Sequence, residues 1–348
     1  MSGGRAVSAQ IRLLRNLPVV LLVVVFVVFS LLDSRFFDPD TLVNVARQAS
    51  YIGILAVGLT FVLITAGIDL SVGSIMYLAA VVVSDVLATS ALPVAVVPLL
   101  MLAVGLVLGA VNAFGVTLLR IVPFIVTLAT LTAYRGIALT RSQSREANYP
   151  PEITAIGSTE VLGIPVPVIV FAVVVLVAHV VLTRTALGRQ VYAVGQDRVA
   201  AERAGIPARR VLASVYVISG GLAGLAAFVA VSQLGTVSPG FGTNDEFDAI
   251  AAAVLGGTSL FGGRGNVFPG TVVGALLVQL IAVGLVFTQV DLYLTPMVSA
   301  AIIFLAVLLD TVRTRQLTRL ERRSIRVEGD DEARPTPAPP AVLEGDRA

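Results

Sequence analysis

The stretch VPVIVFAVVVLVAHVVL, which runs from Val166 to Leu182, contains 17 residues and no residue that is charged at neutral pH. Wound into an α-helix it would be about 25 Å long. Apolar runs of about 17 to 25 residues are long enough to cross the hydrocarbon core of a bilayer as a helix. This stretch therefore predicts a transmembrane helix, and the rest of the chain repeats the pattern.

About ten apolar runs near or above this length follow one another along the 348 residues. The eighth is short and flanked by glycines. The sequence predicts an all-α fold, a polytopic bundle of about ten transmembrane helices. The runs are Leu17 to Leu32, Val43 to Thr65, Ser71 to Ala91, Leu92 to Leu119, Phe124 to Leu139, Val166 to Leu182, Val211 to Val231, Phe247 to Leu260, Val267 to Val290, and Leu294 to Val312.

The composition agrees with a bilayer as solvent. Hydrophobic residues make up 56% of the chain and charged residues only 13%, whereas about a quarter of the residues in soluble domains are charged. All 24 basic residues are arginine, and they fall between the apolar runs rather than among aromatics on a polar surface. A nucleic-acid partner is therefore not expected.

The arginines predict the orientation, because cytoplasmic loops collect positive charge. With ten spans and the N-terminus inside, 19 of the 24 arginines fall on one side. The remaining five are Arg35, Arg47, Arg135, Arg141 and Arg145. Both termini are therefore expected in the cytoplasm.

Three regions follow from this pattern. Residues 1–16 are expected to form a cytoplasmic segment, and residues 17–312 the transmembrane domain. Residues 313–348 are first arginine-rich and then rich in proline and acidic residues. Such a composition buries little apolar surface, so we expect a disordered cytoplasmic tail.

Several kinds of chemistry are excluded by missing residues. The chain has no lysine, so it lacks the residue with which a Walker A loop reaches the phosphates of ATP. It has no cysteine, and its single histidine, His179, lies inside the Val166 to Leu182 run. We expect no catalytic residue, no metal site and no cofactor on this chain, and His179 is interpreted as a packed residue that hydrogen-bonds to a neighbouring helix.

The segment Thr65 to Ser74, TAGIDLSVGS, interrupts the apolar pattern. Asp69 or Ser71 could cap the helix that follows, since its first amides lack partners within the helix. Alternatively, Asp69, Ser71 and Ser74 could line or gate a polar route, because irregular backbone at membrane depth occurs only beside protein or water. Capping is the simpler interpretation.

The longest predicted cytoplasmic loop extends from Thr183 to Arg210. From Asp197 its alanines and charges have helical spacing, and Gly205 stands where a C-terminal cap is expected. The predicted short helix has a thin apolar face, which suits docking on another protein better than anchoring to lipid. That face consists of Val199, Ala200, Ala201 and Ala204.

An acidic cluster, Asp245, Glu246 and Asp248, and a glycine-rich loop from Gly256 to Gly265 flank the eighth run. We expect the acidic cluster at its outer end and the glycine loop at its inner end. Because no lysine follows the glycines, a tight turn between packed helices is favoured over a phosphate loop.

Pairs of glycines four residues apart place small residues on one helix face, where backbones approach closely. Packing within one subunit is favoured over a dimer face as their role. The pairs are Gly105 with Gly109, Gly220 with Gly224, and Gly270 with Gly274.

Three motifs together resemble the ribose-type permease family of bacterial ABC importers. They are Gly67 to Ser74, the loop around Gly188 to Ile206, and Asp248 to Gly265, in this order along the chain. The resemblance covers the chain from about Val43 to Leu309. It implies a multi-pass subunit of the bacterial cytoplasmic membrane that carries a monosaccharide such as ribose or a related sugar.

The resemblance also implies partners: a cytoplasmic ATPase that binds the ATP, an extracytoplasmic substrate-binding protein, and a second permease subunit in a homodimer or heterodimer. Asp69, Ser71 and Gly73 would match the family's signature turn near the pore. The loop that docks on the ATPase would include Gly188, Arg189, Gly195, Ala200, Ala201, Ala204 and Gly205.

Two other classes of function remain open. An ion-coupled secondary transporter would need an ionisable relay near the midplane of the membrane, for which Asp85 and His179 are the candidates. A membrane enzyme would need acid and base groups, which the chain supplies poorly. The identity of the sugar is not legible from the residues.

Overall fold

The apolar runs form helices because a backbone that crosses lipid must satisfy its hydrogen bonds within itself. The computed structural model describes residues 17–90 and 92–289, together with 291, 294, 297, 298, 300, 301, 304, 305 and 308. Of two compact units, Pro18–Val307 contains nearly all of these residues. The predicted N-terminal segment 1–16, the tail 313–348 and most of the last run, 294–312, lie outside the described residues.

The secondary structure is almost entirely helical, which confirms the predicted all-α class. Two short antiparallel strand pairs, β1 with β4 and β2 with β3, are the exceptions among the described residues. The elements are α2 (Leu17–Leu32), η1 (Ser34–Phe37), α3 (Pro39–Ile64), α4 (Val72–Thr89), α5 (Val96–Thr117), α6 (Pro123–Ser142), β1 (Ala147–Asn148), α7 (Pro151–Ser158), β2 (Glu160–Val161), β3 (Ile164–Pro165), α8 (Val166–Arg184), α9 (Ala186–Gln196), α10 (Arg198–Arg203), α11 (Ala208–Leu234), β4 (Thr236–Val237), α12 (Asp245–Leu255), η2 (Val267–Thr271) and α13 (Val272–Phe287).

Seven helices in the described part are long and apolar enough to cross a membrane. They are α3, α4, α5, α6, α8, α11 and the continuous pair η2 and α13. Helix α2 coincides with the first predicted run, but its 16 residues fall short of a typical span. The structure therefore supports a multi-pass bundle, while the predicted count of ten spans is not reached within the described residues.

The eighth predicted run, Phe247 to Leu260, does not form a span of its own. Only Asp245–Leu255 is helical, and 11 residues of helix reach about 16 Å, roughly half of the hydrocarbon core. Helix α12 instead packs antiparallel on the start of η2 and α13: Gly256 lies against Gly270, and Gly274 lies against Ala252. A glycine-rich loop joins the two, so this part of the chain is a helical hairpin.

Helix α3 lies at the centre of the fold and contacts α8, α11, α12 and α13. Beside it, α5 and α11 pack backbone to backbone through the predicted glycine pairs. Gly220 and Gly224 of α11 lie directly against Gly105 and Met101 of α5. Packing within one subunit, the favoured interpretation of this spacing, is confirmed for these helices.

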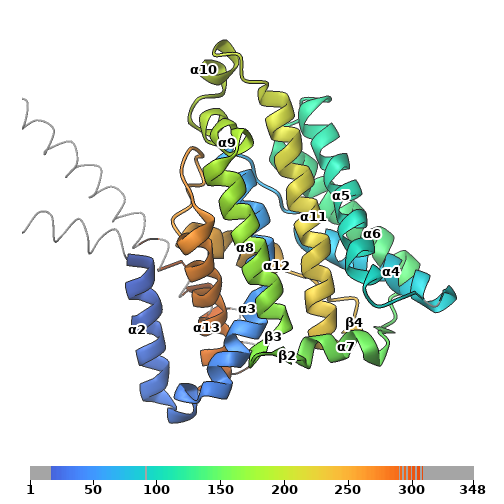
Figure 1. Cartoon of the computed structure of the whole chain (residues 1–348), viewed down its shortest axis with the longest axis vertical. Helices are drawn as coiled ribbons and strands as arrows, with labels where there is room; N and C mark the ends of the chain where they lie inside the picture. Colours follow the sequence, from blue (N-terminus) through green and yellow to red (C-terminus); the bar gives the residue numbers. More distant parts are fainter. Residues whose placement is uncertain are drawn as a thin grey trace, which may run out of the picture. The chain divides into compact units, whose positions relative to one another are not determined.

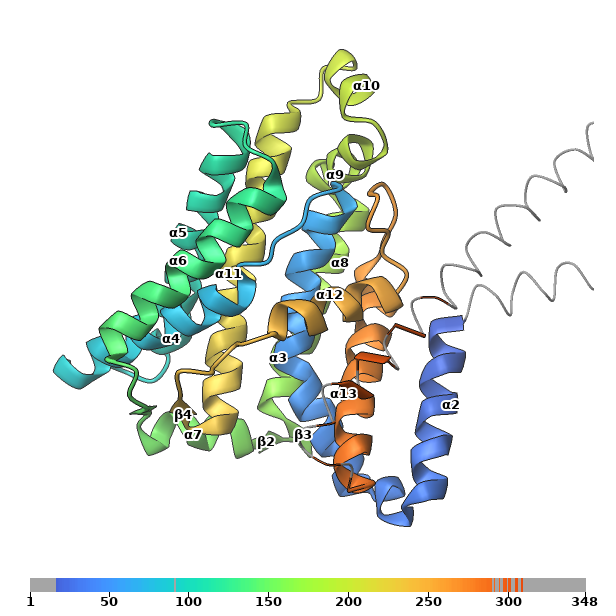
Figure 2. The ribbon, with the colours of Figure 1, turned by 180° about the vertical axis from the view of Figure 1, so that it is seen from behind.

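The bundle has two ends, which Figures 1 and 2 show from opposite sides. One end, called here the α9 end, carries α9, α10 and the glycine-rich loop; the other carries α7 and the strand pairs. Residues 120–123 and 194–198 line one cleft at the α9 end, and Tyr192 contacts Gly265 there. Arg120, Arg198 and Arg264, which belong to these two segments and to the glycine-rich loop, therefore lie at one end of the bundle, as the charge pattern predicts.

Two of the arginines assigned to the outer side, Arg47 and Arg135, lie within helices α3 and α6. Each is held by protein groups: Arg47 pairs with Glu160 at 3.4 Å, and Arg135 binds backbone carbonyls. Partnering of this kind is what makes a charge tolerable within a bundle.

Candidate functional site

The segment between α3 and α4 contains a buried carboxylate, Asp69, with both oxygens hydrogen-bonded. Its Oδ1 accepts from the Ser71 amide at 3.0 Å and from the Ser71 hydroxyl at 2.7 Å. Its Oδ2 accepts from the Ser219 hydroxyl of α11 at 3.0 Å. The Asn112 amide of α5 donates to Ser71 Oγ at 2.7 Å. All four residues are at most 1% exposed, and together they are called the Asp69 network below.

The Asp69 network shows in part how the start of α4 is capped, for which Asp69 and Ser71 were the predicted candidates. Ser71 is the N-cap of α4, but its side chain makes no capping hydrogen bond. Asp69 supplies the acceptor for the Ser71 amide instead. Asn112 and Ser219 were not predicted as site residues from the sequence. The only feature that could have identified them is that each is a polar residue inside an apolar run.

The residues predicted as a gate are tightly packed. Asp69, Ser71 and Ser74 are fully buried, and the Ser74 hydroxyl donates to the Ser71 carbonyl at 2.7 Å. A Cβ added at Gly73 would meet the Gly242 carbonyl and the Glu246 carboxylate. The segment thus joins α4 to α5, α11 and α12, and a gating role for these four residues stays a prediction.

On the side of this segment away from the α9 end, Arg135 of α6 binds the turn that precedes α12. Its guanidinium donates to the carbonyls of Phe241 at 3.2 Å and Gly242 at 3.0 Å. It also lies 5.4 Å from the centre of the Tyr77 ring, within the range of a cation–π contact. The acidic cluster follows in the first turn of α12, and Glu246 is 6% exposed. Arg135 therefore holds the turn that leads directly into the three acidic residues of α12.

The predicted docking loop folds into two short helices, α9 and α10, at the tip of the α9 end (Figure 1). Thr185 caps α9 by accepting from the Gly188 amide at 3.2 Å. Asp197 caps α10 by accepting from the amides of Val199 and Ala200, at 2.8 and 3.0 Å. The helix that the spacing predicted after Asp197 is confirmed, and Gly205 follows it with a φ of +82°, as a C-terminal cap requires.

The predicted docking residues divide into two groups. Arg189, Ala200, Ala204 and Gly205 are exposed, as is Val199 at 57%. Ala201 is only 5% exposed and faces its own chain. Gly188 is buried against the Leu182 carbonyl, and Gly195 is half-buried. A partner could therefore touch the first group directly but not Ala201 or Gly188.

The last turn of α9 is joined to two other segments. Tyr192 Oη donates to the Gly265 carbonyl and Gln196 Nε2 to the Gly263 carbonyl, both at 2.8 Å. The Gly263 amide donates to the Ile64 carbonyl at the end of α3, also at 2.8 Å. Burial raises the pKa of the Tyr192 phenol, so its hydroxyl stays a neutral donor.

A cleft of about 550 Å³, lined by both polar and apolar residues, lies beside this contact. Its walls are residues 65–67, residues 120–123 and the segment 194–198, together with Val116 and Leu212. None of Asp69, Ser71, Gly73 or Ser74 lines it. The cleft opens between the docking helices and the segment that leads to Asp69.

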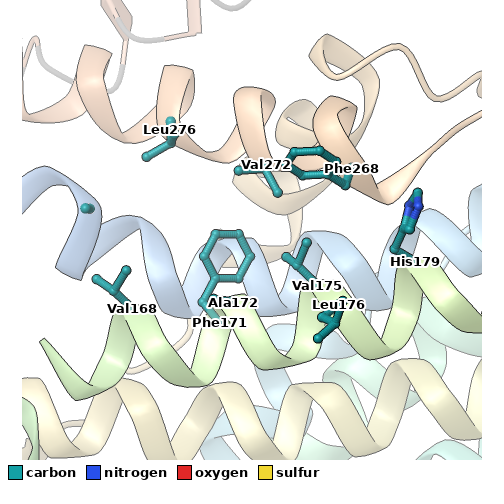
Figure 3. A pocket seen from close by; sticks show the side chains of 10 residues that line it. Val168, Phe171, Ala172, Val175, Leu176, His179, Phe268, Val272 and Leu276 are labelled. Carbon is teal, nitrogen blue, oxygen red and sulfur yellow. The ribbon is translucent and has the colours of Figure 1, made fainter. Parts of the chain in front are cut away.

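His179 faces a different, apolar groove of about 480 Å³, formed by α8, η2 and α13 with Ala46 of α3. Figure 3 shows its imidazole at one end of the groove, near Phe268. The two rings are 6.2 Å apart and edge-on. No side-chain hydrogen bond to His179 is found among the described residues, so its expected bond to a neighbouring helix is replaced by a ring contact.

Asp85, the other candidate for an ion relay, is near the end of α4 and pairs with Arg141 at 2.9 Å. Both side chains are about half exposed, at 42% and 52%. His179 instead faces the apolar groove between α8 and η2. The structure does not bring Asp85 and His179 into one site.

Comparison with known proteins gives a consistent result over most of the chain. Residues 41–307 match the family model described as branched-chain amino acid transport system / permease component. The ribose import permease protein RbsC of Haemophilus influenzae is 36% identical over 294 residues, covering 83% of this chain and 90% of that protein. The ribose import permease protein RbsC of Bacillus subtilis is 37% identical, covering 84% and 91%.

A relative named for a different sugar is almost as similar. The D-allose transport system permease protein AlsC of Escherichia coli is 35% identical, covering 84% of this chain and 89% of that protein. No solved structure matches the chain.

Proposed function

The chain belongs to the family of branched-chain amino acid transport system permease components, and on this premise we propose that it is the membrane subunit of an ATP-driven importer of a monosaccharide. The observation that carries the proposal is the similarity to sugar permeases at 35 to 37% identity over more than four fifths of the chain. Ribose or a related sugar is the expected solute, because ribose and allose permeases are among these relatives.

The α9 end is assigned to the cytoplasm, where an ATPase subunit would dock on α9 and α10. The excess of arginine at this end supports the assignment. Between the charged side chains of α10, Ala200 is small and exposed, as are Ala204 and Gly205 directly after the helix, which leaves room for close contact with a groove on another protein. ATP is bound by that partner, since this chain has no lysine for a Walker A loop.

A substrate-binding protein would deliver the sugar at the opposite end, and a second permease subunit would complete the pathway. Transport then proceeds by alternating access: the ATPase displaces α9 and α10, and the helices open to one side of the membrane at a time. The network around Asp69 stands between α4, α5 and α11, the helices that such a movement would rearrange.

Replacing Ala200 by arginine is the direct test of the docking surface. Ala200 is exposed on α10, so a large charged side chain there is compatible with folding but would hold the ATPase away. We expect sugar uptake to fall at least tenfold and co-purification of the ATPase to be lost, with unchanged membrane insertion. Ala200→Ser, which keeps a small side chain, should transport like the wild type.

Uptake of labelled ribose in cells that lack the ATPase subunit tests the class of transporter. The proposal requires that uptake disappears there, whereas persistent uptake would favour an ion-coupled carrier. Competition by unlabelled ribose, allose and fructose ranks the sugars. Normal uptake by the Ala200→Arg variant would refute the docking assignment but not the proposed class of transporter.

A further inference from the structure

Contacts behind the docking helices point to a route by which their movement enters the membrane domain. Helix α9 is fixed on its own chain by the buried side chains of Val191 and Val194. Its last turn, however, contacts the glycine-rich loop and the end of α3, which belong to two different parts of the bundle. This contact of Tyr192, Gln196, Gly263, Gly265 and Ile64 is called the α9 junction below.

The α9 junction leaves no gap through which one part could slide past another. A Cβ added at Gly195 would overlap the Ile64 carbonyl and lie 2.8 Å from the Gly263 amide nitrogen. A Cβ added at Gly262 would lie 2.8 Å from the Gly195 carbonyl. Because three backbones touch here, displacement of α9 pushes on the other two directly.

Each of those two backbones leads to the interior. Ile64 is followed by residues 65–71, a segment that contains the hydrogen-bonded pair Asp69 and Ser71. The loop 262–265 is the tip of the hairpin formed by α12 and η2, and the far end of α12 carries Glu246 against Gly73. Both branches therefore reach the start of α4 from opposite directions.

Pushing contacts transmit movement in one direction only, whereas hydrogen bonds also transmit a pull. The bonds from Tyr192 and Gln196 are the side-chain bonds that tie α9 to the glycine-rich loop within the described residues. Gln196 is exposed, and Tyr192 is half-buried with its ring packed against the core, a ring that Tyr192→Phe would keep. Their hydrogen bonds can thus be removed while the glycine contacts remain.

We propose that Tyr192 and Gln196 are positioning residues that couple the docking helices to the glycine-rich loop, so that each ATP cycle moves the hairpin of α12 and η2. The inference rests on the proposed function and adds to it the path of the coupling. The cleft of about 550 Å³, which includes residues 65–67 and 194–198, would change its width with every such movement.

The double variant Tyr192→Phe with Gln196→Met tests this proposal, because it removes both donors and keeps similar side-chain volumes. The complete importer, with its ATPase and binding protein, is reconstituted in proteoliposomes with ribose as the probe. We expect at least a fivefold fall in the ratio of sugar transported to ATP hydrolysed. ATP hydrolysis and the melting temperature should stay close to those of the wild type.

A matched control is Tyr134→Phe, which removes another hydrogen bond from a phenol to a backbone carbonyl. Tyr134 of α6 donates to the Leu108 carbonyl of α5 at 3.0 Å, away from the α9 junction. Its ratio of transport to hydrolysis should equal that of the wild type.

Two results would overturn the proposal. The first is an unchanged ratio in the double variant; the second is a parallel loss of transport, hydrolysis and melting temperature, which would show a structural brace only. A wild-type importer without ATP-dependent uptake would instead contradict the proposed function, so the two failures are distinguishable.

Discussion

Replacing Gly220 by valine is expected to prevent the permease from reaching its folded state at 37 °C. A Cβ at Gly220 would overlap the Gly105 carbonyl and lie 2.6 Å from the Gly109 Cα. Both neighbours are helix backbone, which cannot rotate away as a side chain can. Overpacking of a core usually costs about 1 to 3 kcal/mol, and we expect at least the upper value here. The melting temperature in detergent and the yield of monodisperse protein measure the effect.

Two glycines provide controls for the Gly220 variant. At Gly136 of α6, a Cβ would have no atom within 4 Å, so Gly136→Val should leave the melting temperature unchanged or raise it. Gly221 faces the Leu106 side chain, which can shift, so Gly221→Ala should have an intermediate effect. Equal melting temperatures for Gly220→Val and Gly136→Val would disprove backbone contact between α5 and α11.

The second large effect is expected for Asp69→Ala. This change removes the acceptor for three buried donors: the Ser71 amide, the Ser71 hydroxyl and the Ser219 hydroxyl. A buried donor without a partner costs about 1 to 3 kcal/mol, and hydrogen bonds between membrane helices contribute about 0.6 kcal/mol on average. We expect a loss of about 3 kcal/mol in the free energy of unfolding, measured by chemical denaturation in detergent.

Asp85→Ala is the matched control for the Asp69 variant. Asp85 also pairs with a side chain from another helix, but the pair is about half exposed. Exposed ion pairs contribute about 0 to 1 kcal/mol, so the loss should be several times smaller. Asp69→Asn, which retains one carbonyl oxygen, should lie between the two. Equal losses in the free energy of unfolding for Asp69→Ala and Asp85→Ala would contradict the larger contribution expected from the buried Asp69 network.

The positions of most long helices could be predicted from the sequence. The run Val166 to Leu182 became α8 (Val166–Arg184), and the short helix expected after Asp197 became α10. These predictions succeed because they depend on local features, namely the length of an apolar run and the residues that cap a helix. Contacts with distant parts of the chain have little influence on these local features.

Features that depend on packing could not be predicted in the same way. The eighth run became the half-length helix α12, because close approach at Gly256 and Gly274 turns it into a hairpin. Ala201 was grouped with Ala200, yet it is buried while Ala200 is exposed. On a thin alanine face, hydropathy does not show which side chain faces its own chain.

The sequence by itself determined that this chain is a helical membrane protein, that its arginines favour one side, and that it lacks the lysine of a Walker A loop. Only the tertiary structure decided which polar residues meet. Asp69 binds Ser219, 150 residues further along the chain, and Tyr192 binds Gly265, 73 residues further along. The physical reason is range: lipid acts on each apolar segment separately, whereas a buried hydrogen bond depends on how distant helices are packed.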